Sequence, residues 1–171
     1  MNLVEEILKD HSKKQKDKIV NYVGDDPKRF TQLVEVFLQG PYRVTQRAAW
    51  PLSYCIEKYP NLLKPHFRKI IRQLGEQNIH DSVKRNTLRM LQFVRVPKVH
   101  QGITIDLCLG FLANTNEPIA IRVFAMTVLA NIAQEVHELK NELIPIIEDQ
   151  LPYASAGFLS RSGKVLKQLK Q

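Results

Sequence analysis

The residues best suited to chemistry in this sequence are arginines that stand beside its single tryptophan. Four side chains spaced by 4, 3 and 4 residues would share one face of a helix: Arg43, Arg47, Trp50 and Tyr54. Guanidinium groups next to aromatic rings grip phosphates and stack on bases, which favours nucleic-acid binding. The alternative is structural, with Trp50 packed between repeats and the arginines in solvent. We favour the structural interpretation, because charged helix faces are usually solvated.

Further basic residues follow at helical spacing. Arg85 and Arg89 are one turn apart, and Lys64, Arg68 and Arg72 occupy positions i, i+4 and i+8 of the segment between. These positions complete a candidate binding set: Arg43, Arg47, Trp50, Tyr54, Arg68, Arg72, Arg85 and Arg89.

The charge of the chain is concentrated in one part of the sequence. The formal net charge is +8, and residues 41–98 hold 12 basic and 3 acidic side chains, whereas residues 99–151 hold 2 basic and 7 acidic ones. A basic segment beside an acidic one makes a dipolar surface, which selects an acidic partner at one place.

Motifs for catalysis or metal binding are missing. The chain has no C-x-x-C, H-E-x-x-H, G-x-S-x-G, P-loop or dinucleotide-binding glycine pattern. Its five histidines are dispersed without the i, i+4 pairing that places two imidazoles on one metal ion. We therefore predict a protein that is not an enzyme and has no metal and no cofactor.

Composition indicates a soluble, cytoplasmic protein. No apolar run approaches the roughly 20 residues of a membrane span, and the first residues are acidic where a signal peptide would be basic. The two cysteines, Cys55 and Cys108, fall on apolar helix faces, where a free thiol behaves as a small hydrophobe.

An internal repeat organises the sequence. Val44, Ala48, Leu52 and Cys55 share one helix face, and their pattern of large, small, large and apolar residues returns at starts 39, 38 and 37 residues apart. The later matches are Val83, Thr87, Leu91, Val94; Ile121, Ala125, Leu129, Ile132; and Phe158, Ser162, Leu166, Leu169. The small second residue lets neighbouring helices approach closely.

A second apolar series lies between these helices and predicts a partner helix in each repeat. Its members are Thr31, Val34, Leu38; Phe67, Ile70, Leu74; Ile105, Cys108, Leu112; and Ile144, Ile147, Leu151. Breakers separate the helices: Gly24 ends one, Asp26 and Pro27 begin the next, and Asp81 is the expected N-cap of another. Because strand patterns are absent, we predict an all-α fold.

Residues 119–132, IAIRVFAMTVLANI, resemble the second helix of a HEAT repeat, and the likeness extends over about residues 26–171. The resemblance to the HEAT and armadillo family, including short bacterial proteins of this type, implies a right-handed α–α superhelix of about four helix pairs. The predicted single domain comprises an N-terminal capping pair and four repeats: 1–24, 26–60, 61–97, 98–136 and 137–171. In the cap we expect a solvated lysine face: Lys13, Lys14, Lys16 and Lys18.

The sequence departs from the family pattern in the column that often carries an arginine ladder. That column reads Thr45, Lys84, Arg122 and Leu159. The architecture is also distantly similar to alkylpurine DNA glycosylases built of HEAT-like repeats, which need an acid in a groove lined with aromatic side chains. One turn after Trp50 stands Tyr54 instead of an acid, so the resemblance does not extend to that chemistry.

These features predict a binding or scaffold module that presents helices to a protein or peptide partner. The alternative is nucleic-acid binding through the basic surface of residues 41–98. An enzyme on this scaffold would require an acid from another repeat close to Trp50.

Overall fold

The computed structural model describes residues 1–171 and is built of α-helices and short 3₁₀ segments without strands. The predicted all-α class is confirmed. The chain forms two compact units, residues 1–94 and 95–171, which are described separately. The prediction of a single domain over the whole chain stays a prediction.

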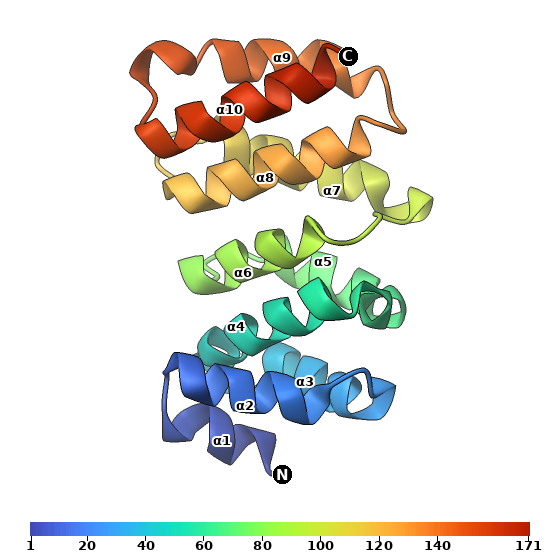
Figure 1. The fold of residues 1–171 in the computed structure, drawn as a ribbon, viewed down its shortest axis with the longest axis vertical. Helices are drawn as coiled ribbons and strands as arrows, with labels where there is room; N and C mark the ends of the chain where they lie inside the picture. Colours follow the sequence, from blue (N-terminus) through green and yellow to red (C-terminus); the bar gives the residue numbers. More distant parts are fainter. The chain divides into compact units, whose positions relative to one another are not determined.

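The first unit consists of six α-helices and a 3₁₀ segment. They are α1 (Leu3–Lys9), α2 (Lys13–Val23), α3 (Pro27–Gln39), α4 (Tyr42–Lys58), η1 (Pro60–His66), α5 (Phe67–Leu74) and α6 (Asp81–Leu91). Helices α2, α4 and α6 are successive neighbours, and α3 and α5 lie behind α4 and α6 in the view of Figure 1. The predicted capping pair corresponds to α1 and α2, and the first two repeats to α3–α4 and α5–α6.

The second unit contains two further helix pairs. Its elements are α7 (Lys98–Ala113), α8 (Ile119–Ile132), α9 (Leu139–Glu148), η2 (Leu151–Tyr153) and α10 (Ala156–Leu169). Helix α8 packs on both α7 and α10 (Figure 1). One pair lies within residues 98–136 and the other within residues 137–171.

Local sequence explains where the helices of the first unit begin and end. Gly24 has φ +55°, a conformation that favours glycine, and it ends α2. The Asp26 carboxylate accepts hydrogen bonds from the backbone N–H groups of Lys28 (2.8 Å) and Arg29 (3.2 Å), so it caps α3. The cap predicted at Asp81 is wrong: His80 has the extended N-cap backbone, and its Nδ1 accepts from Ser82 N–H at 3.0 Å.

The predicted core is buried in most of its positions. In the two sets of four that begin at Val44 and Ile121, each residue is at most 3% exposed. Seven predicted core positions are only half-buried: Thr31, Leu38, Val94, Ile105, Ile144, Leu151 and Leu166. At five of them, all except Val94 and Leu151, an adjacent residue faces the core instead. Phe37 and Val165 are buried where Leu38 and Leu166 are only half-buried. Val94 lies beyond α6, which ends at Leu91 and continues as turns with i→i−3 hydrogen bonds.

Candidate binding site

The aromatic face of α4 is filled by cations from the helices on either side. The Tyr54 ring lies between Lys16 of α2 and Arg89 of α6: the Lys16 Nζ is 3.7 Å, and the Arg89 guanidinium carbon 4.1 Å, from the ring centroid. Both distances are well within the range of cation–π attraction. Tyr54 therefore links three successive helices of the first unit.

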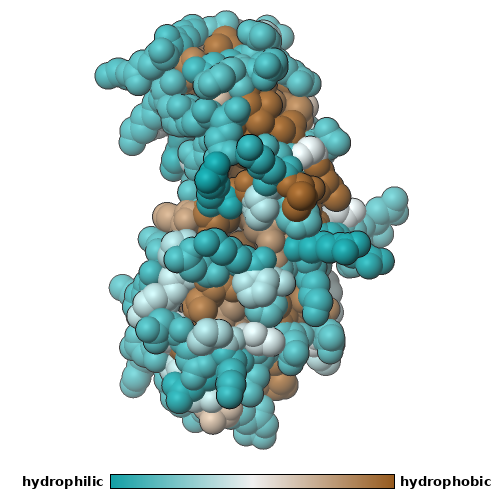
Figure 2. Space-filling model, turned by 90° about the vertical axis from the view of Figure 1, so that its right-hand side faces the viewer, coloured by the Kyte–Doolittle hydropathy of each residue, from teal (hydrophilic) through white to brown (hydrophobic).

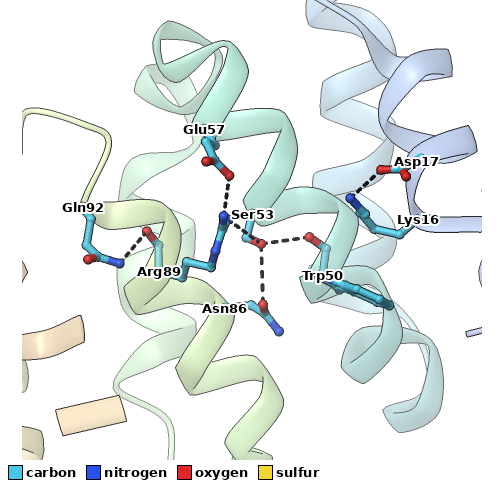
Figure 3. A network of polar contacts seen from close by, with 8 residues as sticks. All are labelled: Lys16, Asp17, Trp50, Ser53, Glu57, Asn86, Arg89 and Gln92. Atoms are coloured by element: carbon cyan, nitrogen blue, oxygen red, sulfur yellow. Dashed lines mark hydrogen bonds and ion pairs between the residues drawn. The ribbon is translucent and has the colours of Figure 1, made fainter. Parts of the chain in front are cut away.

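Lys16 is not part of a solvated face, which corrects the sequence prediction. Its side chain is only 6% exposed, whereas Lys13, Lys14 and Lys18 are exposed as expected. The Lys16 ammonium pairs with Asp17 at 2.5 Å (Figure 3). That ammonium, through its hydrogen bond, holds the pKa of Asp17 below its usual value. The aliphatic stem of a lysine is buried readily when its charged end finds partners.

Arg89 is also occupied within the fold. Its guanidinium donates to Glu57 and, at 3.4 Å, to the Ser53 hydroxyl (Figure 3). The Ser53 hydroxyl in turn donates to the Trp50 carbonyl oxygen at 2.8 Å. Arg89 is thus a structural cation that joins α6 to α4, and its charge is matched by an acid.

Trp50 packs against the turn between α1 and α2. Its ring meets His11 edge to face, with the centroids 5.2 Å apart. One turn earlier, Arg47 donates to the Leu8 carbonyl oxygen at 3.0 Å. The favoured sequence interpretation has Trp50 packed between repeats and the arginines in solvent; Trp50 does contact the preceding cap, whereas Arg47 is not simply solvated. These contacts show that Arg47 serves the N-terminal cap.

An acid does lie close to Trp50. Asp10 lines a cavity of about 10 Å³ together with Trp50 and His11. A hydrogen bond from Ser12 is the main reason why the pKa of Asp10 lies below its usual value, so the carboxylate is held ionised. A cavity of this size has room for about one water molecule, which leaves no place for a substrate beside the acid.

A larger pocket shares Trp50 and His11 with this cavity. It measures about 300 Å³ and takes its walls from the α1–α2 turn, α4 and α6. The lining residues are His11, Gln46, Trp50, Ser82, Arg85 and Asn86. We call this the Trp50 pocket. No acid lines it, and Arg85 is exposed and forms no hydrogen bond or ion pair.

The pKa of His11 is lowered from its ordinary value. Burial is the largest cause, and the positive charges of Arg47 and Arg85 act in the same direction, while Asp10 opposes them. The imidazole is therefore neutral at pH 7, with one nitrogen as donor and the other as acceptor.

The eight predicted binding residues do not form one surface. Arg43, Arg47, Trp50 and Tyr54 lie on α4, and Arg85 and Arg89 on the adjacent α6, whereas Arg68 and Arg72 lie on α5, behind α6 in Figure 1. Only Trp50 and Arg85 of the set line the Trp50 pocket. The sequence prediction missed the polar residues that complete it: His11, Gln46, Ser82 and Asn86. Ser82 and Asn86 are one turn apart, so their spacing could have indicated a shared face.

The second unit has a larger but less coherent pocket. It measures about 670 Å³ and is lined by residues that include Arg122, Gln150, Glu117 and Asp149. Arg122 donates to Gln150 and lies 4.8 Å from the Phe158 ring, while its Nε is buried without a partner. Two acids and one arginine give this pocket no consistent charge. The one face drawn in Figure 2 is mostly hydrophilic, with patches of hydrophobic residues between the hydrophilic ones.

The chain offers neither a metal cluster nor a membrane-spanning element. No three His, Cys, Asp or Glu side chains gather where they could hold one ion. None of the helices combines the length and the apolar composition needed to cross a membrane.

Stacked helix pairs whose neighbours contact one another define an α-helical repeat protein. The chain belongs to the HEAT repeat domain family, whose model matches residues 3–169. No curated protein matches the chain. It is similar to an engineered protein of known crystal structure, at 18% identity and a TM-score of 0.64, with 98% of this chain and 79% of that chain covered. At this identity the likeness concerns the fold alone.

Proposed function

We propose that this HEAT repeat protein is a non-catalytic scaffold that binds a protein or peptide through the α4–α6 face of the first unit. The Trp50 pocket is the observation that carries the proposal. It combines one aromatic wall, an unpaired guanidinium and amide and hydroxyl groups, which is a set suited to one side chain of a partner. A cytoplasmic setting, as expected from the sequence, belongs to this proposal.

Charge distribution supports the choice of this unit. Residues 1–94 carry 17 basic and 10 acidic side chains, whereas residues 95–171 carry 8 and 7. The excess of positive charge attracts acidic surfaces and speeds their association.

The contacts of the arginines favour a protein partner over nucleic acid. A protein that follows a phosphate backbone needs a row of unpaired cations. On this face Arg89 is matched by Glu57, Arg47 serves the Leu8 carbonyl, and Lys16 is buried beside Asp17. Arg68 and Arg72 lie on α5, outside that face.

Site-specific cross-linking tests the proposal. A photoreactive residue in place of Arg43, which is exposed at the start of α4, is compared with one in place of Arg72, which is exposed on α5. In lysate treated with nuclease we expect a discrete protein adduct at position 43 and none at position 72. Adducts that disappear with nuclease, or equal adducts at both positions, would count against the proposal.

A further inference from the structure

We infer that the Trp50 pocket is the receptor for an anionic side chain of the peptide partner, either a carboxylate or a phosphoryl group. Arg85 supplies the charge and Trp50 the wall against which the side chain packs. This inference rests on the proposed protein-binding function and names the chemical group that the pocket selects.

The first argument is the unmatched charge of Arg85. Arg89, on the same helix, pairs with Glu57, and Arg47 donates to a backbone oxygen. Arg85 lines the pocket, is exposed and has no hydrogen bond or ion pair. A guanidinium without a side-chain partner is suited to bind a carboxylate or phosphoryl group through two parallel hydrogen bonds.

The second argument is a further donor that lines the pocket with Arg85. The Asn86 amide nitrogen donates one hydrogen to the Ser82 carbonyl oxygen at 2.8 Å, which leaves its second hydrogen unused. The Asn86 amide oxygen lies 3.5 Å from the Ser53 hydroxyl, whose single hydrogen is donated to the Trp50 carbonyl oxygen at 2.8 Å. A ligand group that only accepts hydrogen bonds, such as an ionised oxyanion, satisfies such donors.

The third argument is size. Pockets for whole small molecules measure about 300 to 1,000 Å³. The Trp50 pocket, at about 300 Å³, is at the lower limit of that range. It therefore accommodates the end of a side chain, while the rest of the peptide would lie outside it along α4 and α6.

Electrostatics around the neighbouring histidine agree with this assignment. Burial is the largest cause of the lowered pKa of His11, and the positive charges of Arg47 and Arg85 add to it against the opposing charge of Asp10. An anion bound at Arg85 would offset those positive charges. The imidazole would then serve as an additional donor at the edge of the pocket.

Trp50 is the only tryptophan, so its fluorescence reports directly on the pocket. The probes are a short peptide of alternating glutamate and glycine, the same peptide with one phosphoserine, and the same peptide with glutamine in place of glutamate. We expect a saturable change in emission with either anionic peptide at constant ionic strength, and none with the glutamine peptide. Whichever anionic peptide binds more tightly identifies the oxyanion.

Two variants with the same loss of charge separate the pocket from general attraction. Arg85→Gln should weaken binding of the anionic peptides by about tenfold or more, since it removes the charge-assisted hydrogen bonds to the oxyanion. Arg72→Gln, a change on α5, should leave the affinity unaltered. The inference is overturned if both variants bind as the wild type does, if both are weakened alike, or if the glutamine peptide binds equally well.

The failure of this inference differs from a failure of the proposed function. A partner that is cross-linked at position 43 with the same yield in wild type and in Arg85→Gln would retain the protein-binding function and refute the anionic pocket. If an oligothymidylate saturates the emission change more tightly than any peptide, and the cross-linked adducts vanish with nuclease, both proposals fail.

Discussion

The ammonium group of Lys16 lies 3.7 Å from the centroid of the Tyr54 ring, although the two residues belong to different helices. Arg89 covers the same ring from α6. Removing the ring should therefore loosen three helices together. We expect Tyr54→Leu to lower the free energy of unfolding by about 1 to 3 kcal/mol, because each partly desolvated cation–π contact contributes about 0.5 to 2 kcal/mol.

The matched control is Tyr54→Phe, which keeps the ring and its contacts with both cations. Its unfolding midpoint in urea should remain close to that of the wild type. Equal losses for leucine and phenylalanine would show that the hydroxyl, and not the aromatic face, stabilises this position.

Burial of Lys16 predicts unequal reactivity among the lysines of α2. Lys13 and Lys14 are exposed, whereas the Lys16 side chain is 6% exposed and engaged with Asp17 and Tyr54. Brief acetylation followed by mass spectrometry should modify Lys16 more slowly than Lys14. In Tyr54→Leu the rate at Lys16 should rise. Equal rates at the two lysines in the wild type would contradict the buried position.

The repeat could be predicted from sequence because helical period and core burial are local properties. The spacing of Val44, Ala48 and Leu52 identifies a buried face whatever the neighbouring helix is. The fate of Lys16 could not be predicted in that way. Its burial depends on the ring of Tyr54, which is close only after α2 and α4 have packed. From sequence alone, a long amphipathic side chain such as that of lysine is predicted to be solvated, because its packing partners are not known.

The site illustrates the same limit. The stripe of Arg47, Trp50 and Tyr54 was visible, since it lies on one helix. The Trp50 pocket was not visible, because His11 comes from a turn and Asn86 from the next repeat. Sequence also gave no sign of which arginines would be paired, and that pairing distinguishes Arg85 from Arg89.

Protonation of His11 should be coupled to anion binding. Burial and the charges of Arg47 and Arg85 lower its pKa, with Asp10 opposing, so the folded protein binds fewer protons than the unfolded chain just below pH 6.5. The free energy of unfolding therefore decreases as the pH falls and His11 takes up a proton in the unfolded chain. A bound anion favours the imidazolium, so affinity for the glutamate peptide should increase between about pH 7.5 and 6.

Titration of Trp50 emission at each pH measures this dependence. His11→Asn should make the affinity nearly independent of pH in that range, while the glutamates of the peptide stay ionised. His66→Asn is the control, because the pKa of His66 is also lowered although His66 does not line the Trp50 pocket. Its Nε2 lies 3.1 Å from the Thr31 hydroxyl. The coupling would be refuted if the affinity still depended on pH in His11→Asn, or if that dependence disappeared in His66→Asn.

Arg122 in the second unit forms no hydrogen bond to an acidic side chain. It donates to the amide oxygen of Gln150, and burial lowers its pKa. Gln150→Glu would give the guanidinium a counterion and should raise the free energy of unfolding by about 0.5 to 1 kcal/mol. Urea unfolding measures the change, and the gain should shrink in high salt. A loss of stability would show that the lost hydrogen bond from the Gln150 amide to the Ile146 carbonyl oxygen, 2.9 Å in the wild type, and repulsion from Asp149 outweigh the new pair.

The two cysteines report separately on the two compact units. Cys55 is fully buried in the first and Cys108 in the second, and burial raises the pKa of each thiol to about 12. Neither should react with a disulfide reagent at neutral pH until its unit opens.

Labelling at increasing urea, with the modified cysteine identified by mass spectrometry, gives an opening free energy for each unit. The prediction of one domain over residues 1–171 requires the two values and their urea dependence to coincide. Different values would mean that the units unfold independently, and rapid labelling without urea would contradict the burial of the thiols.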